Sequence, residues 1–307
     1  MYTELLSSCT LCPRECGVNR LRGETGFCRC GEKVRIARAG LHMWEEPCIS
    51  GSGGAGTVFF SGCSLRCCYC QNYQVSHEGK GFELTAEELA QVFLSLQCIG
   101  AENIELVTGA QYVPMILTSL DICGERLKLP VVYNSGGYES LKTLELLRGR
   151  VDVFLPDIKY SSPELAQKYS KAADYPETAF AAVKKMVDIA GKPRLDDKGR
   201  LLSGVVVRHL ALPGCRHDTE AVLRRLADEI GTENILLSLM SQYIPVGEAM
   251  AHKELSRRIS TFEYNRAAEL AQELGFSGYF QQRSAAKDEY VPEFYDDKNE
   301  GLKQLLT

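Results

Sequence analysis

From residue 57 onward, short apolar segments alternate with longer amphipathic segments, and this alternation restricts the possible folds more than any other feature of the sequence. The apolar segments have the length and composition of buried β-strands and cover residues 57–60, 104–108, 129–134, 151–158, 204–210 and 235–240. Each is followed by a segment with helical periodicity. Strand-then-helix units of this kind join parallel strands through right-handed crossovers. The sequence therefore predicts an α/β fold built on a parallel sheet.

Local signals mark where several of the predicted helices begin. Thr85 and Glu88 form the pattern of a capping box, in which each side chain bonds to the other residue's backbone N–H. Ser260 and Glu263 repeat this pattern ahead of a helix that should stop at a glycine. Ser162 is followed by a proline, which suits an N-cap and the first helical position. Three helix starts are thus predicted from capping chemistry alone.

The predicted units fit two architectures, a partial (β/α)6-type barrel and an open doubly wound sheet. Residues 192–200 are predicted to form a hairpin or exposed loop, and residues 278–281 an additional edge strand. In both architectures, ligands bind at the carboxyl ends of the parallel strands. The residues directly after each strand are therefore the first candidates for a functional site.

The charge and composition of the chain exclude several classes of function. The 307 residues carry a net charge of −5, so no basic surface for nucleic acid or anionic membrane is expected. No apolar segment approaches the roughly 20 residues of a membrane helix, and the N-terminus lacks a secretory signal pattern. A cytoplasmic protein is expected.

Cysteine is the unusual component of the sequence. Ten of the 13 cysteines fall within the first 70 residues. An odd number of cysteines without an export signal argues against a disulfide framework. Clustered thiols in such a chain indicate metal ligands or redox groups.

The strongest cysteine pattern follows the strand predicted at residues 57–60. Cys63, Cys67 and Cys70 are spaced as C-x3-C-x2-C. Three thiolates can hold three irons of a [4Fe–4S] cluster and leave the fourth iron open, whereas electron-carrying clusters normally take four cysteines. Zinc is the competing metal, but a structural zinc site needs a fourth ligand. Cys68 does not easily supply it, because adjacent side chains project differently.

This pattern, with Tyr69 just before its last cysteine, resembles the signature of the radical S-adenosylmethionine (SAM) superfamily. Together with the cysteine-rich residues 9–20, it resembles the branch related to pyruvate formate-lyase activating enzyme. The resemblance implies that Cys63, Cys67 and Cys70 ligate a [4Fe–4S] cluster whose open iron is chelated by SAM. It also implies reductive cleavage of SAM to a 5′-deoxyadenosyl radical that abstracts hydrogen, with flavodoxin or ferredoxin as reductant.

The same resemblance implies cofactor-binding roles for residues at other strand ends. Tyr69 and Gly109 are candidates, although the glutamate of the family's Gly-Gly-Glu segment is absent after Gly109 and Gln111 or backbone carbonyls would replace it. Further candidates are Asn134, Asp157, Lys159 and Arg208. Asp157 and Lys159 are two residues apart in a predicted strand, so they should share one face. No catalytic residue is assigned from the sequence.

The N-terminal cysteines form a second candidate set. Cys9, Cys12, Cys16 and Cys28 supply four thiolates, which suit structural zinc or a second, fully ligated Fe–S cluster. Cys30 competes with Cys28 for the last position, and a metal-free packed module is the alternative. The other cysteines outside these sets, namely Cys48, Cys98, Cys123 and Cys215, are predicted to be small core residues, as is His209.

These observations give one working hypothesis. The chain is expected to be a radical SAM oxidoreductase with a cysteine-rich module at 1–50, a partial (β/α)6-type barrel at 51–283 and a tail or lid at 284–307. An activase that abstracts hydrogen from a glycine of a partner protein is favoured over an enzyme acting on a small metabolite. The rivals from other classes are a zinc-binding structural or regulatory protein and an electron-transfer protein.

Overall fold

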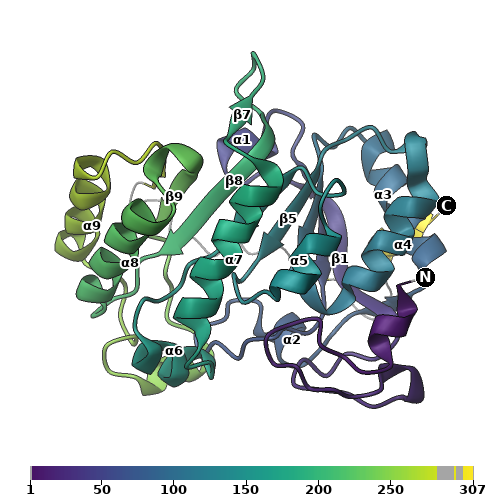
Figure 1. The fold of residues 1–307 in the computed structure, drawn as a ribbon, viewed down its shortest axis with the longest axis horizontal. Coiled ribbons are helices and arrows are strands. Elements are labelled where there is room, and N and C mark those ends of the chain that lie inside the picture. The colour runs from purple at the N-terminus through teal and green to yellow at the C-terminus, as the bar shows by residue number, and fades with distance from the viewer. Residues whose placement is uncertain (1, 282–293, 295–299, 307) are drawn as a thin grey trace.

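The six predicted strands lie side by side as parallel neighbours in one sheet of a computed structural model, which describes residues 2–281, 294 and 300–306 (Figure 1). The sheet order is β10-β9-β8-β6-β5-β4-β2-β1-β3, and β7 pairs with β8. The strands are β1 (Val34–His42), β2 (Ala55–Phe60), β3 (Phe82–Leu84), β4 (Ile104–Val107), β5 (Val131–Ser135), β6 (Val153–Pro156), β7 (Arg194–Leu195), β8 (Leu201–Leu210), β9 (Leu236–Met240) and β10 (Gly278–Phe280). This sheet confirms the predicted parallel α/β architecture of the partial-barrel class.

The helices lie mainly on the outer face of the sheet, except the short helix at Pro47–Ser50, which packs on the inner face (Figure 1). They are α1 (Pro47–Ser50), α2 (Tyr73–Ser76), α3 (Ala86–Cys98), α4 (Val113–Cys123), α5 (Leu141–Leu146), α6 (Pro163–Ser170), α7 (Tyr175–Ala190), α8 (Arg216–Glu229), α9 (Thr261–Glu273) and α10 (Glu300–Leu306). Thr85 and Ser260 each form a complete capping box, and the Ser162 hydroxyl accepts the Leu165 N–H. The three helix starts predicted from capping chemistry are therefore confirmed.

Two antiparallel strands were not expected from the sequence. β1 pairs with β2 over most of its length, and β3 pairs with the beginning of β1. β1 mixes buried apolar positions with Arg35 and Arg38, so it lacks the continuous apolar character of the parallel strands. A division of the chain at residue 50 would separate β1 from the sheet to which it belongs. The irregular N-terminal part is thus shorter than the predicted module, ending before Val34.

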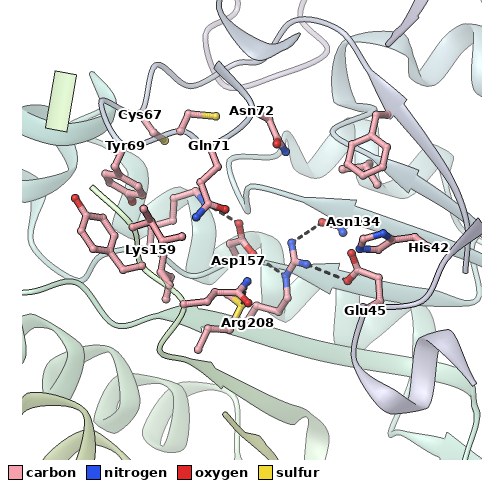
Figure 2. Close-up of a pocket in the computed structure, with 18 residues that line it drawn as sticks. His42, Glu45, Cys67, Tyr69, Gln71, Asn72, Asn134, Asp157, Lys159 and Arg208 are labelled. Carbon is pink, nitrogen blue, oxygen red and sulfur yellow. Dashed lines mark hydrogen bonds and ion pairs between the residues drawn. The ribbon is translucent and has the colours of Figure 1, made fainter. Parts of the chain in front are cut away.

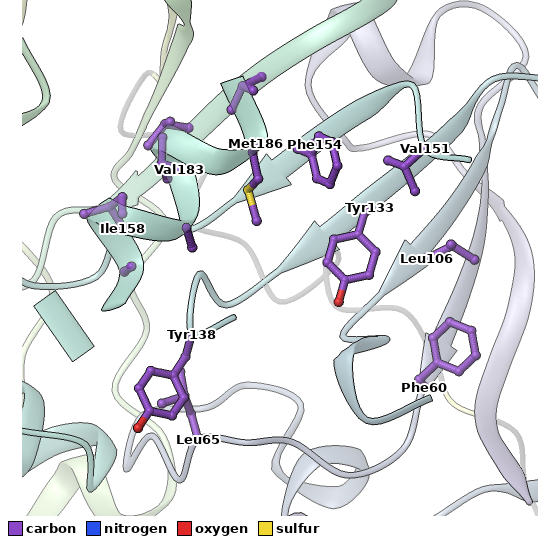
Figure 3. Packing of buried hydrophobic residues seen from close by; sticks show 14 of the residues in the cluster. Phe60, Leu65, Leu106, Tyr133, Tyr138, Val151, Phe154, Ile158, Val183 and Met186 are labelled. Carbon is purple, nitrogen blue, oxygen red and sulfur yellow. The ribbon is translucent and has the colours of Figure 1, made fainter. Parts of the chain in front are cut away.

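Successive side chains of a strand point to opposite faces of the sheet, and apolar side chains form a layer on each face. The larger core lies between the sheet and the helices and includes Tyr133, Phe154 and Met186 (Figure 3). A smaller cluster occupies the opposite face, where Ile49 of α1 packs against the amino-terminal halves of the strands, including Val132. The short helix α1 therefore fills the inner face at the beginning of the parallel strands and leaves their carboxyl ends for polar side chains.

The last described helix is packed onto the body of the protein. Leu302 and Leu305 of α10 are buried, and the Ser95 hydroxyl of α3 donates a hydrogen bond of 2.7 Å to the Leu305 carbonyl. Most of the predicted tail or lid, residues 284–293 and 295–299, lies outside the described residues. Among the helices that the structure describes, none is long and apolar enough to cross a membrane.

Candidate functional site

The inner face of the sheet changes from apolar to polar along each strand. In β5 and β8, buried Val132 and Val206 are followed two residues later by Asn134 and Arg208, which line a cavity of about 250 Å³. Asp157 continues β6 in the same way. Residues two apart in a strand lie on the same face of the sheet. The apolar layer with Val132 and Val206 is therefore followed, on the same face, by the polar layer with Asn134 and Arg208. We call this space the polar cavity.

Three cysteines meet beside the polar cavity. The loop after β2 brings Cys63, Cys67 and Cys70 to the wall of a space of about 170 Å³, which we call the thiol cavity. Asn134, Asp157, Lys159 and Arg208 line both cavities. The two cavities are therefore adjoining parts of one site at the carboxyl ends of the strands.

Backbone contacts fix the path of the cysteine loop. The Cys68 N–H donates to the Tyr169 carbonyl at 2.8 Å, and Arg14 from the N-terminal segment donates to the Ser64 carbonyl at 3.0 Å. Gly62 has φ near +81°, and a Cβ at this position would lie 2.8 Å from the Cys28 carbonyl oxygen. Only glycine suits such a position, since the conformation and the contact both exclude larger residues.

Each thiol of the loop has a polar contact that would also suit a thiolate. The Leu65 N–H points to Cys63 Sγ at 3.3 Å. Cys67 Sγ lies 3.0 Å from the Ser170 hydroxyl, and Cys70 Sγ lies 3.2 Å from the Ser76 hydroxyl. Hydrogen bonds of this kind tune the potential of Fe–S clusters, so the surroundings fit a sulfur-ligated group.

One cation, Lys159, acts on all three thiols of the loop. Burial raises the pKa of Cys63, Cys67 and Cys70, and Lys159 opposes this shift at all three. Negative charge on one thiol also raises the pKa of its neighbours. A metal group bound here would have to displace the three thiol protons, and Lys159 would stabilise the resulting negative charge.

The three thiols fit a cubane cluster better than a single ion. Among the described residues, no three His, Cys, Asp or Glu side chains converge on one ion position. A cubane distributes its ligands over three separate irons, so it does not require such convergence. The donor set, the cavity and the missing fourth thiolate at this loop all fit a [4Fe–4S] cluster with one open iron.

Arg208 is the centre of the polar cavity (Figure 2). Its Nε donates to Asp157 Oδ1 at 2.9 Å, and its two terminal nitrogens donate to Asn134 Oδ1 at 2.7 Å and Glu45 Oε2 at 3.3 Å. Lys159 Nζ donates to the other oxygen of Asp157 at 2.6 Å. Asp157 therefore joins the two cations and fixes the position of each.

Carboxylates outnumber cations around this centre. Burial would raise the pKa of Asp157, but Arg208 and Lys159 lower it below its ordinary value. Burial and nearby Glu105 raise the pKa of Glu45 well above its ordinary value despite Arg208. Burial raises the pKa of Glu105 to about 7, opposed by its bond from Asn134. The site is thus built to hold negative charge on Asp157 and to resist it on the two glutamates.

Two of the predicted cofactor residues have other neighbours. Tyr69 lines the polar cavity, and its hydroxyl lies 2.6 Å from that of Tyr160. Gly109 lines neither cavity, and a Cβ there would lie 2.8 Å from Ile116. Close packing explains this glycine.

Gln111 does not face the site as its suggested role requires. Its Nε2 donates to the carbonyls of Ser61, Gly62 and Thr108 at 3.1, 3.1 and 2.8 Å. The side chain therefore supports the backbone just before Cys63, and the expectation that it would contact a cofactor is corrected. Its position one turn after β4 does not distinguish these two roles in the sequence.

The structure brings the four N-terminal candidate cysteines together. A space of about 20 Å³ is lined by Cys9, Cys12, Cys16 and Cys28. Cys30 is buried and does not line this space, and its Sγ lies 3.3 Å from the Cys28 carbonyl. Burial raises the pKa of Cys12 to about 12. A metal at this set stays a prediction.

Outside the two cysteine sets, most of the residues predicted to lie in the core are buried, and one is exposed. His209 is buried, with Nδ1 2.6 Å from the Ile158 carbonyl and Nε2 3.0 Å from the Thr219 hydroxyl, so its core role is confirmed. Cys48, Cys123 and Cys215 are buried as predicted. Cys98 is exposed at the end of α3, where the prediction of a core position is wrong.

Two site residues were missed by sequence reasoning. Glu105 is a charged residue inside an otherwise apolar strand, which was an available signal of an inward-facing functional group. Glu45 lies in the loop after β1, a strand that was itself not predicted. Its position in the cavity depends on tertiary structure, and no local pattern marks it.

Comparison with known proteins agrees with this geometry. The sequence profile of the Radical SAM superfamily matches residues 57–226, more than half of the chain. An uncharacterized protein of Methanocaldococcus jannaschii is 29% identical over 278 residues, covering 87% of this chain and 75% of that protein. Pyruvate formate-lyase-activating enzyme of Clostridium pasteurianum is 32% identical over 117 residues, covering 36% of this chain and 48% of that enzyme.

A solved structure shares the fold. The crystal structure of Streptococcus suis SuiB bound to S-adenosylmethionine matches with a TM-score of 0.50 at 11% identity. The match covers 74% of this chain and 50% of SuiB. At this identity the likeness concerns the arrangement of strands and helices only.

Proposed function

The chain belongs to the radical SAM superfamily, and from that premise we propose that it is an enzyme that reductively cleaves SAM at a [4Fe–4S] cluster held by Cys63, Cys67 and Cys70. The observation that carries the proposal is the meeting of these three thiols in one cavity beside a polar cavity at the strand ends. A fourth thiolate from this loop is not required, since the open iron would be the site at which SAM binds.

The residues of the polar cavity would orient the bound cofactor. Lys159 and Arg208 are the cations nearest the thiol cavity, and Asp157 holds both in place through bonds of 2.6 and 2.9 Å. Asn134 and Tyr69 supply further polar groups on the same wall. A cofactor carboxylate would compete with Asp157 or Glu45 for these cations.

When bound, the cluster supplies one electron and SAM supplies the 5′-deoxyadenosyl radical that abstracts hydrogen from a substrate. The protein's part is to position groups and exclude water around this chemistry. Phe59 and Val107 line both cavities with apolar surface, and the short helix α1 closes the inner face below them. These features suit the containment of a reactive group.

The proposal is tested by reconstituting the full-length chain with iron and sulfide under anaerobic conditions. We expect about four irons per chain at this site, an electron paramagnetic resonance spectrum that changes on addition of SAM, and 5′-deoxyadenosine after reduction. Cys63→Ala, Cys67→Ala and Cys70→Ala should each abolish 5′-deoxyadenosine formation.

Cys98→Ala is the matched control, because this thiol is exposed at the end of α3 and far along the chain from the loop. It should leave cleavage unchanged. A reconstituted wild-type chain that contains its cluster and still forms no 5′-deoxyadenosine would refute the enzyme, and zinc in place of iron would favour a structural role.

For the substrate, we propose a glycine of a partner polypeptide, with flavodoxin or ferredoxin as reductant. The local similarity to the pyruvate formate-lyase-activating enzyme supports this choice over a small metabolite. A deuterated candidate peptide should transfer deuterium into 5′-deoxyadenosine. The set of Cys9, Cys12, Cys16 and Cys28 is proposed to hold zinc or a second cluster. Zinc would have to draw the thiols together, since no three converge on one ion position in the described residues. Metal analysis of a Cys12→Ser variant would test for either metal.

A further inference from the structure

A third cavity of about 150 Å³ opens from the polar cavity and has no role in the function proposed above. It lies between the loop after β1 and the strands β8, β9 and β10, and we call it the side cavity. His42, Glu45 and Arg208 line both it and the polar cavity, so the two spaces are continuous. A group held in the side cavity would therefore reach the place where the cofactor is expected.

The wall of the side cavity carries an acidic side chain with an unused oxygen. Glu46 is only 8% exposed, and within the described residues its Oε2 has no hydrogen-bond partner. Its neighbour Glu45 forms an ion pair with Arg208 at 3.3 Å. No ion pair of Glu46 occurs in the described part of the chain. A buried carboxylate oxygen without a donor is costly unless a ligand or water supplies one.

The two cations of the polar cavity bond to groups other than Glu46. Lys159 and Arg208 both donate to Asp157, whose pKa they lower, whereas burial raises the pKa values of Glu45 and Glu105. Three N–H groups of Arg208 donate to Asp157, Glu45 and Asn134, and in the part of the chain that the structure describes Arg208 makes no hydrogen bond to Glu46. Within the described residues, Glu46 is thus left available to a positive group of a ligand.

The composition of the wall favours an organic cation over a metal ion. No three metal-ligating side chains converge anywhere in residues 2–281 or in the other described positions. Trp44 and Tyr279 line the cavity together with Glu46. An aromatic face beside a carboxylate is a favourable environment for an ammonium or guanidinium group.

We propose that the side cavity binds a protonated amine or guanidinium group of the substrate, with Glu46 as its hydrogen-bond acceptor and Trp44 as an aromatic wall. This inference rests on the proposed function, since it assigns a substrate class to that site. The cation belongs either to a lysine or arginine side chain of a polypeptide or to a free small amine. The two sources share the same recognition chemistry.

Ligand-observed fluorine nuclear magnetic resonance on the reconstituted full-length chain tests the proposal without relying on turnover. The probes are 4-fluorobenzylamine and its neutral analogue 4-fluorobenzyl alcohol. The amine should bind about tenfold or more tightly than the alcohol, because only the amine makes a charged hydrogen bond to a buried carboxylate. Glu46→Gln should remove this preference, and Trp44→Ala, at an exposed side chain, should weaken amine binding without affecting folding.

Glu177→Gln is the matched control, since it makes the same substitution at an exposed helical site. It should keep the preference. A second pair of probes, acetyl-Gly-Lys-Gly-amide and its norleucine analogue, separates the sources. Selective binding of the lysine peptide indicates a polypeptide substrate, and binding of the benzylamine alone indicates a small amine.

Equal binding of amine and alcohol would overturn the proposal, as would a preference that survives Glu46→Gln in a folded variant. Weaker SAM binding by Glu46→Gln with the amine preference intact would assign the carboxylate to the cofactor instead. These outcomes are separate from failure of SAM cleavage, because probe binding is measured directly. A chain that prefers the amine and never forms 5′-deoxyadenosine would refute only the enzyme function.

Discussion

Asp157 has more influence on the candidate site than any other single residue. Its two carboxylate oxygens accept bonds from Lys159 and Arg208, which come from different strand ends. Both cations point toward the cavities, where a bound cofactor or substrate would meet them. The geometry of the site thus depends on one carboxylate that is itself shielded from solvent.

Removing the charge of Asp157 should therefore destabilise the fold. Asp157→Asn leaves Lys159 and Arg208 partly buried without their shared partner, and breaking a buried ion pair in this way costs about 3 kcal/mol. Urea denaturation should show this loss in the free energy of unfolding. Asp121→Asn breaks an ion pair with Arg150 at the surface and should cost about 1 kcal/mol or less. Equal losses in both variants would show that Asp157 has no special role.

At the residue scale, sequence spacing predicted the three thiols but not the residues that hold their loop in place. Cys63, Cys67 and Cys70 could be assigned from the sequence because the ligands lie within eight residues of one loop. The contact of Gln111 with the carbonyls of Ser61 and Gly62 spans about 50 positions in the chain. No local pattern contains such a contact, so the sequence allowed a cofactor role that the structure excludes.

At the scale of elements, capping chemistry decides where helices begin. The Thr85 hydroxyl accepts the Glu88 N–H at 3.2 Å, and the Glu88 carboxylate accepts the Thr85 N–H at 2.8 Å. Ser140 precedes α5 in the same position but makes no capping bond through its side chain. These two N-caps form a natural comparison within one protein.

Thr85→Ala should lower the free energy of unfolding by about 1 kcal/mol, because the Glu88 N–H at the start of α3 loses its hydroxyl acceptor. Ser140→Ala should have a much smaller effect. Thermal or urea denaturation of both variants measures the difference. A loss at Ser140 as large as that at Thr85 would contradict the assignment of the stabilisation to the cap.

The elements missed from the sequence share a physical cause. β1 and β3 form the antiparallel end of the sheet, with β3 as its edge strand, and partly exposed charged residues such as Arg35 are tolerated there. The parallel strands are buried on both faces and are therefore continuous apolar segments. Sequence pattern detects the second type far more reliably than the first.

At the scale of the whole molecule, buried carboxyl groups should make stability depend on pH. Glu139 is 3% exposed and accepts a bond from Tyr133 at 3.1 Å, and burial raises its pKa to about 7. An acid with a raised pKa in the folded state keeps its proton there after the unfolded chain has lost it. Its cost to folding is absent below about pH 4.5, grows as the pH rises toward 7 and is constant above that.

Glu139→Gln should remove this pH dependence. Relative to the variant, the wild type should lose on the order of 3 kcal/mol of unfolding free energy between pH 4.5 and pH 8. Burial lowers the pKa of His209 to about 4, which acts in the opposite direction below pH 6.5, but both proteins share it. Urea denaturation across this range measures the difference, and a constant difference would contradict the raised pKa of Glu139.

The sequence by itself determined the parallel α/β fold, the helix starts and the three loop cysteines. Each depends on residues close together in the chain, through strand burial, capping or loop spacing. Only the tertiary structure decided that Glu45 pairs with Arg208, that Glu46 lines the side cavity, and that Gln111 supports the loop before Cys63. These contacts join segments far apart in sequence, and their energies depend on burial, which a linear pattern does not contain.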